Sequence, residues 1–167
     1  PDFLGTDISM LDILIVPSQL NQPLLLKSVN KIHAFAQSGG TVIAFGPQPH
    51  DWLPNQNWEF RPTNFWWWLE ENADSGLLLS APNHSLFARY LTLNDCTWHQ
   101  HGVFWPPEDA EILIASKNGG AVLYEQNSEQ YGHWIITTLD PDYHFGSYFM
   151  PATEKFLEGF FPYLAYE

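Results

Sequence analysis

HWIITTLDPDYH, residues 133–144, joins an apolar run to a cluster of polar side chains. The run up to Leu139 is apolar or β-branched, which predicts a buried strand of ordinary length. Pro141 and the acids on either side of it then end the strand. Ligands of open α/β sheets bind beyond the carboxyl ends of the strands. The first candidate binding residues are therefore Asp140, Asp142, Tyr143 and His144.

Two further buried strands are predicted upstream. LDILIVP (11–17) lacks alternation, as expected of a strand covered on both faces, and TVIAFG (41–46) is similar. Between them, apolar residues recur at helical spacing over 24–37, and Gly39 and Gly40 end that helix. A strand, a helix and a strand in this order form a βαβ unit, so we expect a parallel sheet with a right-handed crossover.

The rest of the chain predicts a mixture of elements. We expect a short strand at 77–80 in the parallel part of the sheet, a turn and short helix in NHSLFARYL, and an alternating strand at 98–104. A β-hairpin is expected from 110–116 and 121–126, with the strand near 133–139 as its third antiparallel partner. A closing helix is expected at 152–165, because its apolar residues share one face.

Composition limits the class of protein. The 167 residues fit one domain, 1–167, and no apolar run approaches the length of a membrane span. A net charge of −13, from 19 acids against 6 Lys and Arg, repels phosphate backbones and anionic membranes. We therefore expect neither nucleic acid nor membrane as a partner. The single cysteine, Cys96, excludes an internal disulfide framework and favours the cytoplasm.

The loop after the strand TVIAFG is rich in proline and aromatic residues. It carries His50, Asp51 and Trp52, which we expect to form a wall of the same cleft, because parallel strands deliver their carboxyl ends to one edge. A tryptophan triplet, 66–68, follows. It predicts a short helix that docks its rings onto the sheet, with an aromatic platform for a sugar as the alternative.

A histidine pair precedes the antiparallel region. The period of two in WHQHGVF places His99 and His101 on one face of a strand. The favoured interpretation is that His99 or His101 forms hydrogen bonds within a polar cleft shared with Asp140, Asp142 and His144. A carboxylate facing an imidazole there would form a charged pair. The alternative is a metal site of His99, His101 and His144, since two histidines so spaced can bind one ion.

The aspartates allow two interpretations. Asp140 and Asp142 could act as a paired acid and base, but residues so close on one loop need not face a common bond. The favoured interpretation is that Asp140 caps the following turn, while Pro141 fixes it.

The order LDILIVP, helix, SGGTVIAFG, NHSLF and a strand ending in an acidic Pro loop resembles the class I glutamine amidotransferase-like superfamily, including its trehalose-utilisation-type relatives. The resemblance covers most of residues 11–165. It implies an α/β, flavodoxin-like three-layer sandwich with a mostly parallel sheet and an antiparallel portion over 98–126. Such domains usually open with a further strand and helix, so we expect an abbreviated fold or a C-terminal portion of a longer protein.

The chemistry of that superfamily does not transfer to this chain. Its working members carry a cysteine after the strand corresponding to TVIAF and a histidine after the last strand. The corresponding segments here are Gly46-Pro47-Gln48 and Asp140-Pro141-Asp142, and Cys96 lies outside any strand-to-helix elbow. We therefore do not expect glutaminase activity.

Two functions remain as expectations. The favoured one is a non-catalytic domain, without a cofactor, that binds a small polar ligand such as a carbohydrate or serves as an assembly module. We expect it to form a homodimer or to dock to a missing N-terminal part. The alternative is a metal-assisted hydrolase that uses His99, His101, Asp142 and His144.

Overall fold

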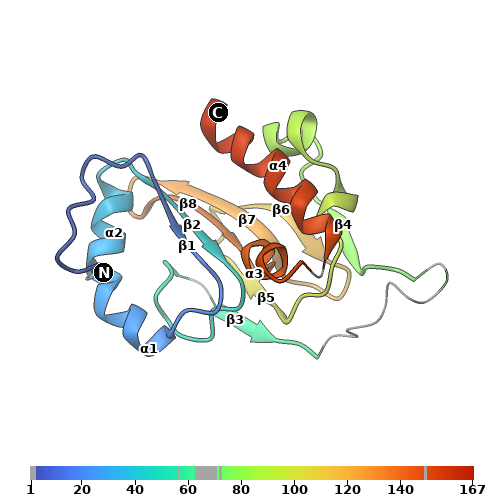
Figure 1. Cartoon of the computed structure of the whole chain (residues 1–167), viewed down its shortest axis with the longest axis horizontal. Coiled ribbons are helices and arrows are strands. Elements are labelled where there is room, and N and C mark those ends of the chain that lie inside the picture. The colour runs from blue at the N-terminus through green and yellow to red at the C-terminus, as the bar shows by residue number, and fades with distance from the viewer. Residues whose placement is uncertain (1–2, 56, 63–70, 72, 149) are drawn as a thin grey trace.

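A computed structural model describes residues 3–55, 57–62, 71, 73–148 and 150–167. Within these residues the fold is α/β, with one mixed sheet of eight strands (Figure 1). The strands are β1 (Ile13–Val16), β2 (Thr41–Phe45), β3 (Asn57–Phe60), β4 (Leu77–Leu79), β5 (Gly102–Trp105), β6 (Glu111–Ser116), β7 (Ala121–Ser128) and β8 (Gly132–Thr137). The helices are α1 (Gln22–Leu25), α2 (Val29–Gln37), α3 (Pro141–Gly146) and α4 (Pro151–Tyr166), with shorter helical segments η1 (Leu26–Ser28), η3 (Leu86–Tyr90) and η4 (Leu93–Cys96).

The parallel part of the sheet consists of β1, β2 and β8, with β2 in the middle. The prediction that residues 11–17 and 41–46 form neighbouring parallel strands is confirmed. Val42 and Ala44 of β2 belong to the core that includes Phe35 of α2. Ile43 and Phe45 belong to the core on the opposite face. Burial of both faces explains why β2 lacks alternation. The expectation that residues 11–17 are also covered on both faces is wrong, because β1 is an edge strand and its Ile15 is 37% exposed.

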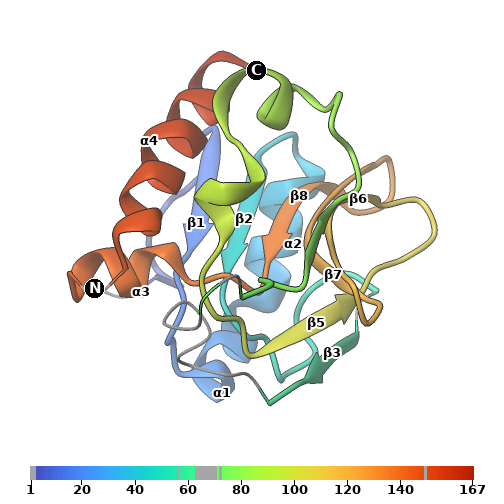
Figure 2. The same cartoon turned by 90° about the vertical axis from the view of Figure 1, so that its right-hand side faces the viewer.

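The remaining strands make the sheet mainly antiparallel, which corrects the expectation of a mostly parallel one. β7 pairs antiparallel with β5, β6 and β8, while β3 pairs with β5 and β4 with β6. In Figure 2, β5 and β3 lie at the end of the sheet away from β1. The predicted hairpin is confirmed, and its short turn can join only antiparallel strands. The strand near 77–80, expected among the parallel ones, is antiparallel to β6.

The predicted helices form where apolar faces meet the sheet. The helix expected at 24–37 is built from α1, η1 and α2. Oδ1 of Asn21 caps it by accepting a hydrogen bond from the backbone N–H of Leu24 at 3.0 Å. The closing helix, α4, buries Phe156 and Phe160. Helix α4 packs on the sheet face opposite α2, so helices flank the parallel strands on both sides.

Two expectations about the loops have different outcomes. Residues 98–101 are not a strand, because β5 begins only at Gly102. Gly102 pairs with Phe60, the last residue of β3. Pro62 follows shortly after and has no N–H with which to continue the ladder. His99 and His101 therefore lie in an irregular segment before β5. The tryptophan triplet, 66–68, lies outside the described residues.

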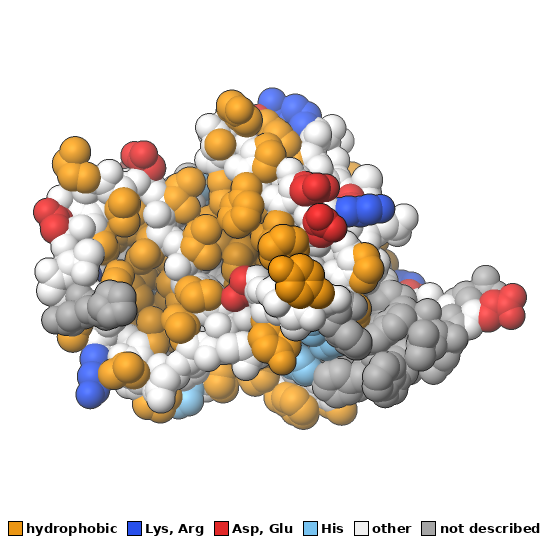
Figure 3. All heavy atoms as spheres, viewed as in Figure 1, with side chains coloured by type: hydrophobic (Ala, Val, Ile, Leu, Met, Phe, Trp, Pro, Cys, Tyr) orange, Lys and Arg blue, Asp and Glu red, His pale blue; other side chains and the backbone are white. Residues whose placement is uncertain are grey.

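The outer edge of β1 is an apolar surface. Among the described strands, β1 pairs only with β2. Next to it lies a cavity of about 300 Å³, lined by uncharged residues of β1, α1 and their connection, and Ile15, Leu20 and Leu24 are 37%, 40% and 60% exposed. Figure 3 shows hydrophobic side chains gathered over β1, between α1 and α4. No helix in the described part of the chain has the length and apolar character needed to cross a membrane.

Candidate functional site

The loops that follow β1, β2 and β8 meet at one edge of the sheet. The backbone N–H and the hydroxyl of Ser18 both donate to Oδ2 of Asp142, at 2.9 and 3.1 Å. The backbone N–H of Gly46 donates to the carbonyl of Leu139 at 2.8 Å. A Cβ on Gly46 would lie 2.7 Å from Cβ of Ser18, so only glycine allows the first two loops to approach this closely. The expected convergence of the strand ends is confirmed.

A pocket of about 520 Å³ opens at this edge. Its walls come from the loop after β1, the segment before β5, and α3, and they are formed by Gln19, His99, His101, Asp140, Tyr143, His144 and Ser147. Pro141 stands at the first position of α3, where its fixed φ suits a helix start. The helix then carries His144 one turn beyond Asp140. The structure therefore brings five of the predicted binding residues into one pocket: Asp140, Tyr143, His144, His99 and His101.

Asp140 lies at the back of the pocket. It is 2% exposed, and its Oδ1 accepts a hydrogen bond from Nε1 of Trp98 at 3.2 Å and lies 3.3 Å from Nε2 of His144. Burial raises the pKa of Asp140 to about 7, against the opposing effect of the Trp98 hydrogen bond. Its side chain makes no capping hydrogen bond to α3, so the predicted capping role is wrong.

Three imidazole rings, those of His99, His101 and His144, lie next to one another in the same pocket as this carboxyl group. The ring centroids of His99 and His144 are 4.6 Å apart and those of His99 and His101 are 5.2 Å apart, both in edge-to-face arrangements. Burial lowers the pKa of His99 to about 4, reinforced by the neighbouring histidines, and burial also lowers the pKa of His101 and of His144. At neutral pH the imidazoles are therefore uncharged.

The electrostatics differ from the predicted charged pair of an aspartate and a histidine. The expectation was a lowered pKa for the acid and a raised pKa for the base. In the structure the pKa of Asp140 is raised and the pKa of His144 is lowered. The reason is that both groups are nearly inaccessible to water, and desolvation disfavours each charged form. A carboxyl group that titrates near neutral pH in a pocket is a common feature of functional sites.

A metal centre is not favoured by the geometry. Across the residues that the structure describes, no group of three His, Cys, Asp or Glu side chains is arranged to hold a metal ion. In the alternative set, the ring of His99 instead meets the rings of His101 and His144 edge to face.

The predicted residues of the proline-rich loop do not line the pocket. Trp52 is 1% exposed, donates from Nε1 to Oε1 of Gln48 at 2.7 Å, and packs on Trp134 with 6.2 Å between ring centroids. These contacts turn the loop into the core on the α2 face, leaving Asp51 exposed and His50 half-buried. Asp142 also does not line the pocket; it holds the adjoining loop through Ser18.

Three residues of the site were missed by the sequence interpretation: Trp98, Gln19 and Ser147. Trp98 adjoins the histidine pair and donates to the buried carboxyl group. Gln19 follows β1 and has a φ of 60°, a conformation that non-glycine residues seldom adopt. Its position after a parallel strand was the available signal.

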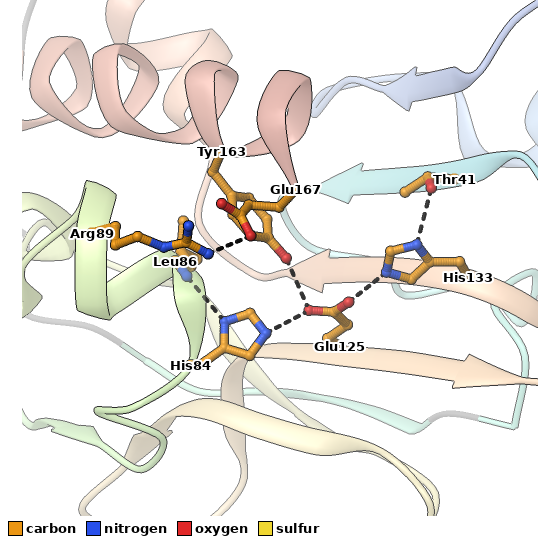
Figure 4. Close-up of polar contacts among 8 residues, drawn as sticks. All are labelled: Thr41, His84, Leu86, Arg89, Glu125, His133, Tyr163 and Glu167. Carbon is orange, nitrogen blue, oxygen red and sulfur yellow. Dashed lines mark hydrogen bonds and ion pairs between the residues drawn. The ribbon is translucent and has the colours of Figure 1, made fainter.

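A second polar cluster is centred on Glu125 of β7 (Figure 4). Its carboxylate contacts Nε2 of His133 at 2.5 Å and Nε2 of His84 at 2.9 Å, and accepts a hydrogen bond from the hydroxyl of Tyr163 at 3.2 Å. Nδ1 of His133 in turn lies 3.0 Å from Oγ1 of Thr41. Burial raises the pKa of Glu125, but the hydrogen bond and charge of His133, with the charge of His84 and the Tyr163 hydroxyl, outweigh it and lower the pKa overall. The cluster links α4 to the sheet at the amino ends of β2 and β8, away from the pocket.

Comparisons with known proteins found no relative. No family model, no curated protein and no solved structure matches the chain. The resemblance to the amidotransferase-like superfamily has no support from these comparisons and stays a prediction.

Proposed function

We propose that this chain is a ligand-binding domain that holds a small, uncharged, hydroxyl-rich molecule, such as a carbohydrate, in the pocket at the carboxyl ends of β1, β2 and β8. The observation that carries the proposal is the grouping of uncharged imidazoles and a buried carboxyl group around a cavity of about 520 Å³. Pockets of this size accommodate small molecules and orient them with a few convergent polar groups.

The chemistry of the lining favours hydroxyl groups. A neutral imidazole has one nitrogen that donates and one that accepts, so it complements a hydroxyl, which also does both. The part of the lining that the structure describes contains no lysine or arginine, and the net charge of −13 repels anions. Tyr143 is 51% exposed and offers an aromatic ring at the pocket, a surface suited to the apolar face of a sugar.

The proposal extends to the fold and the partners of the chain. Helices on both faces of β1, β2 and β8 support a reduced form of the flavodoxin-like sandwich, as in amidotransferase-like domains. The uncovered edge of β1 supports an additional role in assembly, through a homodimer. Cys96, buried and free, fits a reducing, cytoplasmic compartment.

The experiment is a thermal-shift screen of the unmutated protein against D-glucose, D-galactose, trehalose and glycerol, with L-glutamate and inorganic phosphate as charged comparators. A ligand that binds the folded state raises the melting temperature with its concentration. We expect a rise with at least one sugar and none with the anions. The rise should disappear in His144→Ala and in Asp140→Ala, whose side chains line the pocket, and persist in His50→Ala, whose side chain is outside it. No shift with any sugar would refute the proposal.

A further inference from the structure

We propose that the Asp140–His144 pair opens and recloses the ring of a bound reducing sugar, so that the pocket interconverts the two anomers of that sugar. This inference rests on the proposed carbohydrate binding and adds a reaction to it. It concerns proton transfer alone, which the side chains of this pocket can supply.

The geometry of the pair fits this reaction. Opening a cyclic hemiacetal requires one proton to be given to the ring oxygen and one to be taken from the anomeric hydroxyl, and both oxygens are bonded to the same carbon. The donor and the acceptor must therefore be close neighbours on one wall of the pocket. Oδ1 of Asp140 and Nε2 of His144 are 3.3 Å apart, and both residues line the pocket.

The contact between the two groups is weak enough to be exchanged. Charge-assisted hydrogen bonds are typically about 2.7–2.9 Å long, so 3.3 Å is a loose contact. Nε2 of His144 and the carboxyl group of Asp140 are both buried, so a sugar reaches them by entering between the two groups and replacing this contact with one hydrogen bond to each. Trp98 continues to hold the carboxyl group of Asp140 from behind, through its Nε1. Asp140 thus keeps its orientation while the sugar is bound.

The step balances without any further reactant. The carboxylic acid of Asp140 gives its proton to the ring oxygen, and Nε2 of His144 takes the proton of the anomeric hydroxyl. The bond between the anomeric carbon and the ring oxygen breaks, a carbonyl forms, and the ring oxygen becomes a free hydroxyl. After rotation of the open chain, the hydroxyl attacks the other face of the carbonyl, and both protons return to their starting groups.

Cleavage of a glycosidic bond does not suit the same arrangement. That reaction uses two carboxyl groups separated by about 5–9.5 Å across the scissile bond. Of the described residues that line the pocket, Asp140 alone carries a carboxyl group, and Asp142 is held by the backbone and hydroxyl of Ser18. The pair of neighbouring proton-transfer groups is instead suited to two oxygens on one carbon.

The protonation states support the assignment. A pKa of about 7 leaves part of Asp140 protonated at neutral pH, as a general acid requires, while burial keeps His144 uncharged, as a general base requires. The rate should fall at higher pH as Asp140 loses its proton, and at lower pH as His144 becomes protonated. A bell-shaped pH profile follows.

The test follows the optical rotation of freshly dissolved α-D-glucose and α-D-galactose with and without the protein. We expect an acceleration over buffer, reduced by about 10² or more in Asp140→Asn and in His144→Gln, since general acid–base groups contribute factors of that size. Asp51→Asn, an exposed acid outside the pocket, should keep the unmutated rate. If Asp140→Asn does not fold, the rate measured with His144→Gln decides the test. Thermal unfolding of His144→Gln then shows whether that variant is folded.

The outcomes separate this inference from the proposed function. Methyl α-D-glucoside, which cannot open its ring, serves as the probe for binding alone. If it or a reducing sugar stabilises the protein while neither anomer is interconverted faster than in buffer, binding stands and the inference is overturned. Equal acceleration by the unmutated protein and both variants also overturns it. If no sugar binds, both proposals fail together.

Discussion

Nε2 of His144 lies 3.3 Å from Oδ1 of Asp140, yet the pKa of neither group shifts as in an ion pair. The side chains are 5% and 2% exposed, so the loss of hydration outweighs their mutual attraction. At neutral pH His144 is uncharged and Asp140 is partly protonated, so the pair can both donate protons to a ligand and accept them.

Asp140→Asn should stabilise the protein at alkaline pH. Folding raises the pKa of Asp140 from 3.8 to about 7, so the folded state binds this proton more tightly than the unfolded chain. The stabilisation by protonation is full below the unfolded pKa and is lost as pH rises through about 7, a cost of about 4 kcal/mol. Asparagine is never charged, so the free energy of unfolding of the variant should increase relative to that of the unmutated protein as pH rises. Urea unfolding between about pH 5 and about pH 8 measures this. If the stability of Asp140→Asn relative to the unmutated protein stays constant or decreases as pH rises, this prediction is wrong.

Glu125→Gln should destabilise the protein by about 1–3 kcal/mol at neutral pH, because the charged acceptor of two imidazoles and a hydroxyl is lost. The pKa of Glu125 is lowered on folding, so its contribution is present above the ordinary value of 4.5 and is lost as pH falls through the folded pKa. The difference between variant and unmutated protein should therefore shrink in acid. Glu129→Gln, an exposed acid in the turn after β7, is the matched control. Equal effects of the two substitutions would show that the cluster contributes nothing.

Gly46→Ala should cost more stability than Gly76→Ala. Both glycines have left-handed φ values, +80° and +72°, so alanine brings the same backbone strain of about 1–2 kcal/mol to each. Only at Gly46 does the new Cβ meet a neighbour, Ser18, at 2.7 Å, which adds about 1–3 kcal/mol. Thermal unfolding of the two variants compares them directly. Equal losses would mean that the loops after β1 and β2 are not in close contact.

The edge of β1 should bind a second copy of the chain. Its unpaired edge and the uncharged cavity beside it can meet the same surface of another molecule across a two-fold axis, which makes the contact self-complementary. Ile15→Lys should convert the dimer to a monomer in sedimentation velocity. Tyr166→Lys, at the exposed end of α4, should leave it a dimer. A monomeric unmutated protein at all concentrations would refute this proposal.

The parallel part of the fold could be predicted because its signals are local. The apolar runs 11–17 and 41–46, and the helix between them, specify a βαβ unit without reference to distant residues. The partners of β4 and β5 could not be predicted, because pairing across the sheet joins segments far apart in the chain. β3, which pairs with β5, was hidden in a loop rich in proline and tryptophan.

In the candidate site, too, features that follow from local sequence could be predicted, and features that depend on packing could not. The strand-end rule correctly brought Asp140 and His144 to one edge, but it could not tell that Gln48 directs Trp52 into the core. The directions of the pKa shifts were wrong because the depth of burial is a property of the packed structure. Trp98, itself 1% exposed, contacts the carboxyl group of Asp140 and supplies part of that burial.

The most direct test of ligand binding in this pocket follows the imidazole NMR signals of the protein while D-glucose, D-galactose or trehalose is added. Histidine signals assigned by single substitutions report on the pocket through His99, His101 and His144, and on the rest of the molecule through His33 and His133. We expect that one of the sugars shifts the three pocket signals along a common saturable curve and leaves the other two in place. Pocket signals that stay unmoved with every sugar, or that shift no more than those of His33 and His133, would contradict it.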